Sequence, residues 1–233
     1  MLKNTTRQSI KAFSAINNSV IVTYPRTVIK MGKHIQAFID VDKLGESQFE
    51  DVGFLDFGEF NSVVDIIKDA EITESKGILK ISNSNSCVNY TTTTIDIIED
   101  SAQGNPEMID RVKNEEKNTK VATFEIDSEN FDKIKKMSGL LKDLDNFIVE
   151  SIDGKINVSL MDDTRSSKSY SLNVDGSSIE EFKMVMSMDL ISKIPTAAYD
   201  FSIMKSQKGS LICILDSTAT NAISIVVSSK ATL

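Results

Sequence analysis

The sequence has little of what catalysis, metal binding or a disulfide scaffold requires. Its 233 residues include no tryptophan, one histidine, two cysteines and three prolines. The lone histidine, His34, has no carboxylate or cysteine partner at a useful spacing, which argues against a His-based triad or a His-rich metal site. Cys87 and Cys213 lie far apart in strand-like segments, so we expect two buried thiols in a reducing compartment.

Long apolar runs are also missing. No stretch reaches the roughly 18 apolar residues of a transmembrane helix, and the first residues lack the apolar core of a secretory signal. Apolar residues make up 40% of the chain and charged residues 26%, which is ordinary for a globular protein with a substantial core. We therefore expect a soluble protein located in the cytoplasm of the cell, or of a host cell.

Motifs for phosphate or metal binding are absent as well. Gly32-Lys33 and Gly154-Lys155 lack the other glycine of a phosphate-binding loop. Asp162-Asp163 is better explained as a polar loop, and Asp40 with Asp42 as a solvated strand end. The sequence therefore predicts a protein that is not an enzyme and that needs no cofactor and no metal.

The chain does contain clear periodic patterns. Apolar residues at helical spacing predict two longer helices, from Thr5 to Asn17 and from Ser128 to Leu141, and two shorter ones, from Asp56 to Lys68 and from Met188 to Ile194. Asp153-Gly154 is typical of a two-residue hairpin turn. Alternating or β-branched residues predict strands at 19–24, 27–31, 35–41, 77–82, 147–151, 155–160, 170–174 and 209–215.

An internal repeat is the strongest organisational signal. Phe49–Val52, Leu55-Asp56, Ile72 and Lys76–Ile81 recur, offset by about 132 residues, as Phe182–Val185, Met188-Asp189, Ile203 and Lys208–Cys213. The order in both halves is helix, strands, helix, strands. This pattern predicts an α+β protein of two duplicated domains, at 1–100 and 121–233, joined by a polar connector at 101–120 with one helical turn around Met108–Val112.

The charge distribution is uneven. A net charge of −8 argues against a protein that holds DNA over much of its surface. However, residues 1–18 contain Lys3, Arg7 and Lys11 and no acid, and the second long helix carries basic residues too: Lys133, Lys135, Lys136 and, just beyond it, Lys142. We expect these cations to project away from the apolar stripes of their helices. An ordinary solvated helix face explains either helix alone, whereas the agreement between the two halves favours a binding surface.

At this point the order of elements resembles that of a known family, the sliding DNA clamps, and most closely the T4-type phage polymerase processivity factors. The most similar passages are Leu2–Thr6 running into Lys11–Asn17, and Asp69–Ser75 following an apolar helix. The resemblance extends over nearly the whole chain, including its length and the position of the connector. It implies helices packed on curved antiparallel sheets, in a ring of three identical subunits whose helices line a central hole.

The resemblance also implies function and partners. Such a ring encircles duplex DNA without reading its sequence and tethers a DNA polymerase, after a clamp loader has placed it, and in T4-type phages it supports late transcription. The residues expected to face the DNA are Lys3, Arg7, Lys11, Lys133, Lys135, Lys136 and Lys142, with Lys68 and Lys193 as weaker candidates. Candidates for a pocket that takes an apolar partner peptide are Met108, Ile109 and Leu233.

Two other function classes stay open at the level of sequence. A β-rich structural or virion protein would equally lack catalytic residues, but it would form no ring around DNA. A single-strand-binding protein needs aromatic stacking platforms. That class ranks last, because the chain has no tryptophan and four tyrosines, and most of its phenylalanines lie in apolar stripes.

Overall fold

The computed structural model divides the chain into two compact units. It describes residues 2–14, 18–98, 104–162 and 168–230. One unit comprises Met1–Met31 and Ala37–Pro106, and the other comprises Gly32–Gln36 and Glu107–Leu233. No helix in the described ranges is long and apolar enough to cross a membrane.

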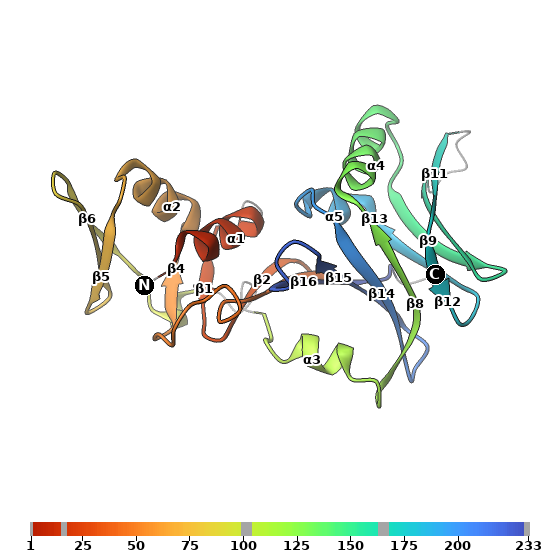
Figure 1. Cartoon of the computed structure of the whole chain (residues 1–233), viewed down its shortest axis with the longest axis horizontal. Helices are drawn as coiled ribbons and strands as arrows, with labels where there is room; N and C mark the ends of the chain where they lie inside the picture. Colours follow the sequence, from red (N-terminus) through yellow and green to blue (C-terminus); the bar gives the residue numbers. More distant parts are fainter. Residues whose placement is uncertain (1, 15–17, 99–103, 163–167, 231–233) are drawn as a thin grey trace. The chain divides into compact units, whose positions relative to one another are not determined.

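The first unit carries two helices and two small sheets (Figure 1). β1 pairs with β4, and β5, β6 and β7 form an antiparallel meander. β2 and β3 are neighbouring strands whose connecting turn is grouped with the second unit. In chain order the elements are α1 (Asn4–Ser14), β1 (Val20–Val22), β2 (Arg26–Gly32), β3 (Ile35–Asp40), β4 (Val52–Phe54), α2 (Phe57–Ile66), β5 (Glu71–Ser75), β6 (Ile78–Ser82), β7 (Cys87–Thr91) and a short 3-10 helix, η1 (Ile95–Ile97).

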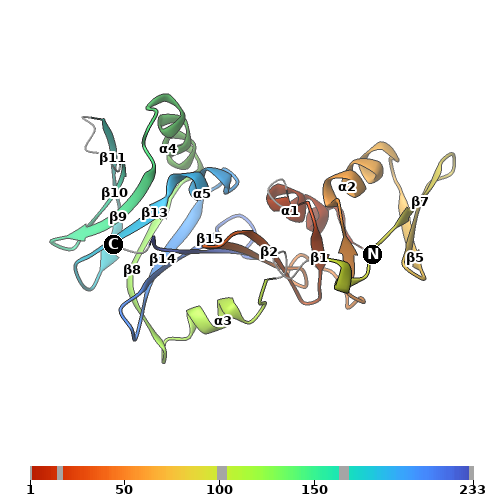
Figure 2. The same cartoon turned by 180° about the vertical axis from the view of Figure 1, so that it is seen from behind.

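The second unit repeats this plan with longer strands (Figure 2). One sheet has the order β11-β10-β9-β13, and in the other β12, β8, β14, β15 and β16 follow one another. The elements are α3 (Met108–Lys113), β8 (Asn118–Ile126), α4 (Ser128–Leu140), β9 (Asn146–Ile152), β10 (Lys155–Met161), β11 (Ser169–Val174), β12 (Gly176–Ser178), β13 (Phe182–Ser187), α5 (Met188–Lys193), β14 (Tyr199–Ser206), β15 (Leu211–Ser217) and β16 (Ile223–Ser228).

The four predicted helices are confirmed, and their starts have local causes. Asp56 caps α2 by accepting a hydrogen bond from the Glu59 N–H at 2.8 Å, and Asp127 caps α4 through the Asn130 N–H at 2.7 Å. The helix predicted from Thr5 is observed as α1, from Asn4 to Ser14, and the predicted end at 15–17 lies outside the described residues.

Each unit has its own apolar core. In the first unit, the α1 side chains Ile10 and Phe13 are buried, and so is a cluster of phenylalanine rings at positions 54, 57 and 60. In the second unit, Phe131 of α4 meets Tyr199 edge-to-face, and Phe124 stacks on Phe201 with ring centroids 4.8 Å apart. Burial of such rings is the main stabilising contribution in each unit.

The internal repeat extends to strand register. Ile72 of β5 pairs with Ile81 of β6, and their counterparts in the repeat, Ile203 of β14 and Cys213 of β15, pair in the same way. Because a one-residue slip would turn every side chain to the opposite face, the shared register shows that the repeat of this strand pair is structural and not only a likeness of composition.

The predicted hairpin turn at Asp153-Gly154 is confirmed. Both residues have positive φ, 51° and 73°, and they join the paired residues Ile152 and Lys155. The Lys76-Gly77 turn has the same form, with φ of 52° and 75° between β5 and β6. Glycine at the second position makes this left-handed backbone accessible at low cost.

Three sequence expectations need correction. Cys213 is buried, but Cys87 is exposed, because it lies on β7 at the end of its sheet. Asp40 is not a solvated strand end, since its carboxylate pairs with Arg26 and, at 2.6 Å, with the Nζ of Lys43. The connector predicted at 101–120 also contains the first residues of β8, whose polar start hides the strand pattern, whereas the helical turn predicted within it is confirmed as α3.

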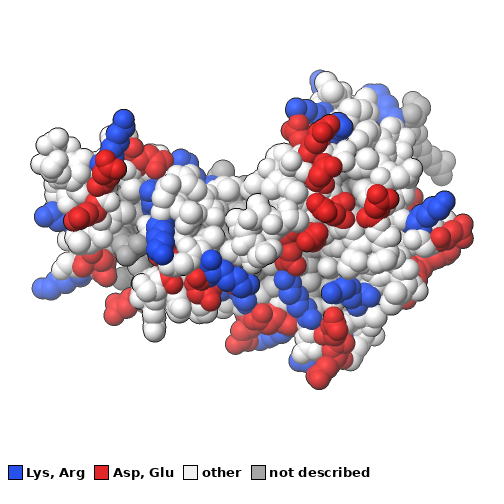
Figure 3. Space-filling model, in the orientation of Figure 1, with Lys and Arg blue, Asp and Glu red and all other residues white. Residues whose placement is uncertain are grey.

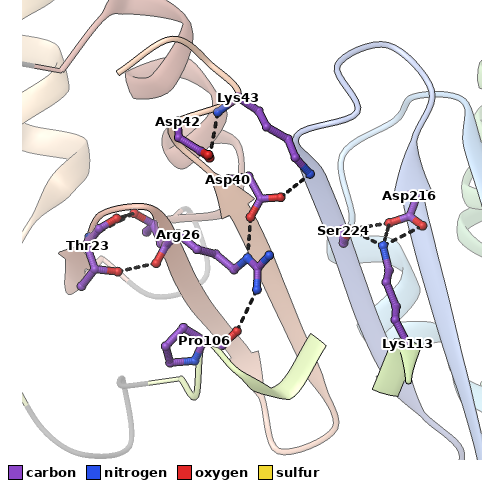
Figure 4. A network of polar contacts seen from close by, with 10 residues as sticks. Thr23, Arg26, Asp40, Asp42, Lys43, Pro106, Lys113, Asp216 and Ser224 are labelled. Atoms are coloured by element: carbon purple, nitrogen blue, oxygen red, sulfur yellow. Dashed lines mark hydrogen bonds and ion pairs between the residues drawn. The ribbon is translucent and has the colours of Figure 1, made fainter. Parts of the chain in front are cut away.

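A hydrogen bond and an ion pair hold two points of that segment, Pro106 and Lys113 (Figure 4). Arg26 pairs with Asp40 and also donates to the carbonyl of Pro106 at 3.1 Å. Lys113 of α3 lies 2.8 Å from an Asp216 oxygen on β15 and 3.3 Å from the Ser224 hydroxyl on β16. The first contact joins Pro106 to the first unit, and the second joins α3 to the second unit.

Candidate nucleic-acid interface

The predicted cations lie mostly on two pairs of helices. α1 packs beside α2 in the first unit, and α4 packs beside α5 in the second (Figures 1 and 2). α1 contributes Arg7 and Lys11, preceded by Lys3, while Lys68 follows α2. In the second unit the cations are Lys133, Lys135, Lys136, Lys142 and Lys193.

Arg7 is not a solvated cation, which corrects the expectation for this residue. It is buried, with 7% of its surface exposed, and its guanidinium donates to Asn61 at 2.9 Å and to Asp65 at 3.3 Å. When the starts of α1 and α4 are matched, Arg7 corresponds to the fully buried Phe131. The position is buried in both units, and in the first unit Arg7 joins α1 to α2.

Lys11 and Lys135 occupy matching positions and act alike. Lys11 reaches Asp65 on α2 at 3.4 Å, and Lys135 donates to the carbonyl of Ile194, just after α5, at 2.6 Å. The Lys135 ammonium also lies 5.9 Å from the centre of the Phe131 ring, so it does not project away from the apolar stripe as expected. Burial lowers the pKa of Lys135, against the opposing charge of Asp132.

Three further lysines pair with an acid one helical turn earlier. Lys133 lies 2.7 Å from Glu129, Lys136 is at hydrogen-bonding distance from Asp132, and Lys193 lies 2.9 Å from Asp189. Figure 3 shows this mixture of signs around α4. The prediction from sequence overlooked these acids, although their spacing of four residues is typical of helical ion pairs.

Lys68 and Lys142 are exposed, and Lys3 is held near the turn at Glu46 and Gly45. The helices are therefore only weakly basic. α1 holds two cations and no acid, α2 two acids, α4 three lysines against two acids, and α5 one of each, so the sums are 0 for the first unit and +1 for the second. Exposed i,i+4 pairs contribute only about 0.3–0.5 kcal/mol each, so a phosphate can replace the acid as the partner of an exposed lysine.

Solved structures of very different sequence share this architecture. Proliferating cellular nuclear antigen from Entamoeba histolytica aligns with a TM-score of 0.65 at 12% identity, covering 96% of this chain and 94% of that protein. The same antigen from A. fulgidus, with the C-terminal region of FEN-1 bound to it, gives a TM-score of 0.66 at 11% identity over 97% of this chain and 95% of its own. The chain has the sliding-clamp fold.

A DNA polymerase III beta subunit, so described, from Eubacterium rectale also matches the clamp fold. Its TM-score is 0.58 at 12% identity, and the match covers 92% of this chain and 57% of that one. No protein-family model and no curated protein sequence matches the chain. At such identities the shared feature is the fold, and the α+β prediction with duplicated, helix-covered antiparallel sheets is confirmed.

Within the clamp fold, the predicted residues of the peptide pocket lie on or after the connector. Ile109 is buried on α3 with 3% of its surface exposed, whereas Met108 is partly exposed. Leu233 lies outside the described residues. The structure thus leaves Met108 as the accessible member of this set on α3.

A separate apolar cavity of about 390 Å³ lies in the first unit of the clamp fold. Its lining includes Leu2, Val22, Val52, Phe54 and Ile72, with the acids Glu50 and Glu74. Sequence reasoning missed it. The available signal was the repeat itself, because the strand β8 precedes α4 while nothing comparable precedes α1 in the described residues.

Proposed function

We propose that the chain is one subunit of a sliding clamp, a ring that encircles duplex DNA and tethers a DNA polymerase for processive synthesis. The observation that carries the proposal is the clamp fold, which spans nearly the whole chain and repeats in both of its units. A ring holds DNA by topology, so its hole needs only weak attraction for phosphates. The helices fit this requirement, because they are nearly neutral and a phosphate can replace the acids that pair with their lysines. The net charge of −8 also limits adventitious DNA binding outside the hole.

Two edge strands support assembly between copies of the chain. β7 is the last strand of its meander, and β11 is the last strand of the four-stranded sheet of the second unit. Among the residues that the structure describes, no strand pairs with the outer side of either, and such edges pair readily with another chain. A head-to-tail contact between β7 of one copy and β11 of the next closes a ring when the rotation suits. The resemblance to T4-type clamps supplies the number three.

The DNA-facing set is proposed in a reduced form. Lys136 and Lys142 are exposed, Lys133 is half-exposed, and Lys68 adds one cation in the first unit. Lys11 and Lys193 contribute after they exchange an acid for a phosphate. Arg7 and Lys135 act chiefly in holding the helices together, and Lys3 does so at the turn after β3.

The proposal also includes partner proteins. In the A. fulgidus antigen the bound partner is the C-terminal region of FEN-1. By analogy, a polymerase and a clamp loader would bind this chain through short apolar segments. Met108 and Leu233 remain the proposed contacts, and the buried Ile109 would support Met108 from within α3.

Retention on DNA of defined topology tests the proposal. The protein is placed on a nicked circular duplex by the loader and polymerase system of its own source, and the complex is then isolated by gel filtration. We expect retention on the circle and loss after one restriction enzyme linearises it, since a ring slides off free ends. Blocking both ends of the linear DNA with bulky protein should restore retention.

Equal retention on circular and unblocked linear DNA would show ordinary surface binding and would contradict the clamp. Absence of retention on every form, together with no stimulation of the polymerase, would favour a structural protein instead.

A further inference from the structure

The first unit leaves open a strand edge that the second unit covers. In the second unit, β8 ends two residues before α4 and pairs antiparallel along β14. Through the repeat, in which Ile72 matches Ile203, β5 is the counterpart of β14. Yet β5 is the terminal strand of its meander, and in the described part of the chain no strand pairs with its second edge.

Leu2 takes the place of the last residue of β8. When Asn4 and Ser128, the first residues of α1 and α4, are matched, Leu2 corresponds to Ile126, and both are buried, with 8% and 1% of their surfaces exposed. The remaining positions of β8 have no counterpart among the described residues. In β8 those positions include Val121 and Phe124, of whose surfaces only 1% and 5% stay exposed.

The apolar cavity of the first unit lies at this open edge. Ile72, Thr73 and Glu74 of β5 form one side of it, and Leu2, Val52 and Phe54 are among the residues of the other sides. Its volume of about 390 Å³ is within the range of about 300–1,000 Å³ found for ligand sites. The cavity therefore offers room for the kind of apolar side chains that β8 buries in the second unit.

The backbone of β5 is available for pairing. The two-residue turn at Lys76-Gly77 makes Ser75 and Ile78 a hydrogen-bonded pair, and pairing then alternates along the hairpin. The N–H and C=O groups of Ile72 and Glu74 consequently point to the open edge. Both residues also line the cavity, so one added strand would meet backbone groups and apolar surface together.

The rim of the cavity is acidic. Glu50 and Glu74 line it, and Asp51 and Glu71, next to them in the chain, are exposed. An occupant with a net positive charge fits this rim, since charge complementarity speeds association and excludes acidic competitors.

We propose that the edge of β5 binds an extended segment of a partner protein by strand addition. The segment carries apolar side chains at alternate positions, which enter the cavity, and a net positive charge, which meets the acidic rim. This inference rests on the geometry of the first unit and on its comparison with the second, and it does not depend on the DNA-encircling role.

The full chain itself supplies a probe. We use a nine-residue peptide with blocked ends and the sequence of β8, residues 118–126, in which Glu125→Lys raises the net charge from 0 to +2. Hydrogen exchange read by mass spectrometry should show rapid exchange at Ile72 and Glu74 in the free protein. Saturating peptide should slow exchange there and leave the amides of β14 unchanged.

Matched charge reversals separate the site from general attraction. The double variant Glu50→Lys/Glu74→Lys should weaken peptide binding about fivefold or more, because two complementary charges of roughly 0.5–1 kcal/mol each become repulsive. The control Glu116→Lys/Glu181→Lys changes the net charge equally at exposed positions of the second unit, and it should bind within about twofold of the parent. A peptide in which both Val121 and Phe124 are replaced by serine should lose protection of β5.

Four results would overturn the proposal. The first is protection of β5 in the free protein at every concentration, which would mean that the chain covers its own edge. The second is protection that rises with protein concentration, which would identify a second copy as the occupant. The third is absence of any change on adding peptide. The fourth is equal loss of binding in the two double variants, which would reduce the effect to net charge.

Discussion

Arg7 illustrates how burial changes the role of a charged side chain. From sequence it belongs to a row of cations on α1, but its guanidinium is buried and bonded to Asn61 and Asp65. Asp65 is itself partly exposed, so the ion pair joins a buried guanidinium to a carboxylate in contact with solvent. Partial desolvation opposes ionisation of Asp65, but hydrogen bonds from Arg7 and then Lys11 prevail and lower its pKa.

Arg7→Glu should therefore destabilise the protein rather than only weaken DNA binding. Removing one partner of a buried pair costs about 3–5 kcal/mol, and the exposure of Asp65 reduces this to roughly 2–3 kcal/mol here. Urea unfolding followed by circular dichroism measures the change. Lys136→Glu, an exposed position on α4, is the control, and it should shift stability by at most about 0.5 kcal/mol.

Asp40 predicts how stability depends on pH. Burial opposes ionisation of Asp40, but the hydrogen bonds and charges of Arg26 and Lys43 prevail and lower its pKa below 3.8. A carboxyl whose pKa is lower when folded stabilises the fold above its unfolded value, and the effect is lost as the pH falls through the folded value.

The difference in unfolding free energy between the parent and Asp40→Asn should thus be about 1 kcal/mol near pH 7 and should shrink below pH ~4. Urea titrations at a series of pH values measure it. Asp42→Asn is the control, because the Asp42 carboxylate accepts a hydrogen bond from the backbone N–H of Lys43 at 2.8 Å. A gap that widens on acidification would contradict the assignment.

At the scale of elements, the helices and turns could be predicted from the sequence, whereas the directions of the charged side chains could not. The four helices, the Asp153-Gly154 turn and the repeat were predictable because caps, periodicity and glycine act locally. β8 was not, since the polar residues Asn118 to Lys120 hide a strand that is defined by its pairing with β14. The directions of Arg7 and Lys135 depended on the neighbouring helix, which sequence alone does not place.

The exposed lysines of α4 and its C-terminal end should contribute to DNA association. The triple variant Lys133→Glu/Lys136→Glu/Lys142→Glu should leave the fold intact, because all three residues are exposed. It should weaken association and reduce the log–log slope against salt by up to about one unit for each phosphate that is no longer neutralised. Filter binding across a range of salt concentrations measures the slope.

A triple variant outside the helices, Lys76→Glu/Lys117→Glu/Lys155→Glu, makes the same change in charge. It should keep most of the salt dependence. If the salt dependence of DNA association falls equally in both variants, the attraction comes from net charge and the DNA-facing assignment of α4 is wrong.

At the scale of the whole molecule, the duplicated units leave the edges β7 and β11 free for contacts between copies. The chain of 25.7 kDa should assemble as a trimer with about three times that mass in light scattering at tens of micromolar. Val88→Lys places a charge on the exposed edge strand β7 and should favour the monomer.

Ile179→Lys is the matched control, since Ile179 is 73% exposed and lies outside β7 and β11. It should keep the mass of the parent. A parent protein that stays monomeric at these concentrations would rule out a stable ring in solution, and a dimer would change only the stoichiometry.

The unequal environment of the two cysteines has a practical consequence. Burial raises the pKa of the Cys213 thiol and keeps it away from reagents, whereas Cys87 is exposed on β7. A maleimide dye should therefore attach once to each native chain, at the strand proposed to join its neighbour. The wild-type protein thus has a natural position for a fluorescent reporter, from which opening and closing of single rings could be followed by energy transfer without removal of any cysteine.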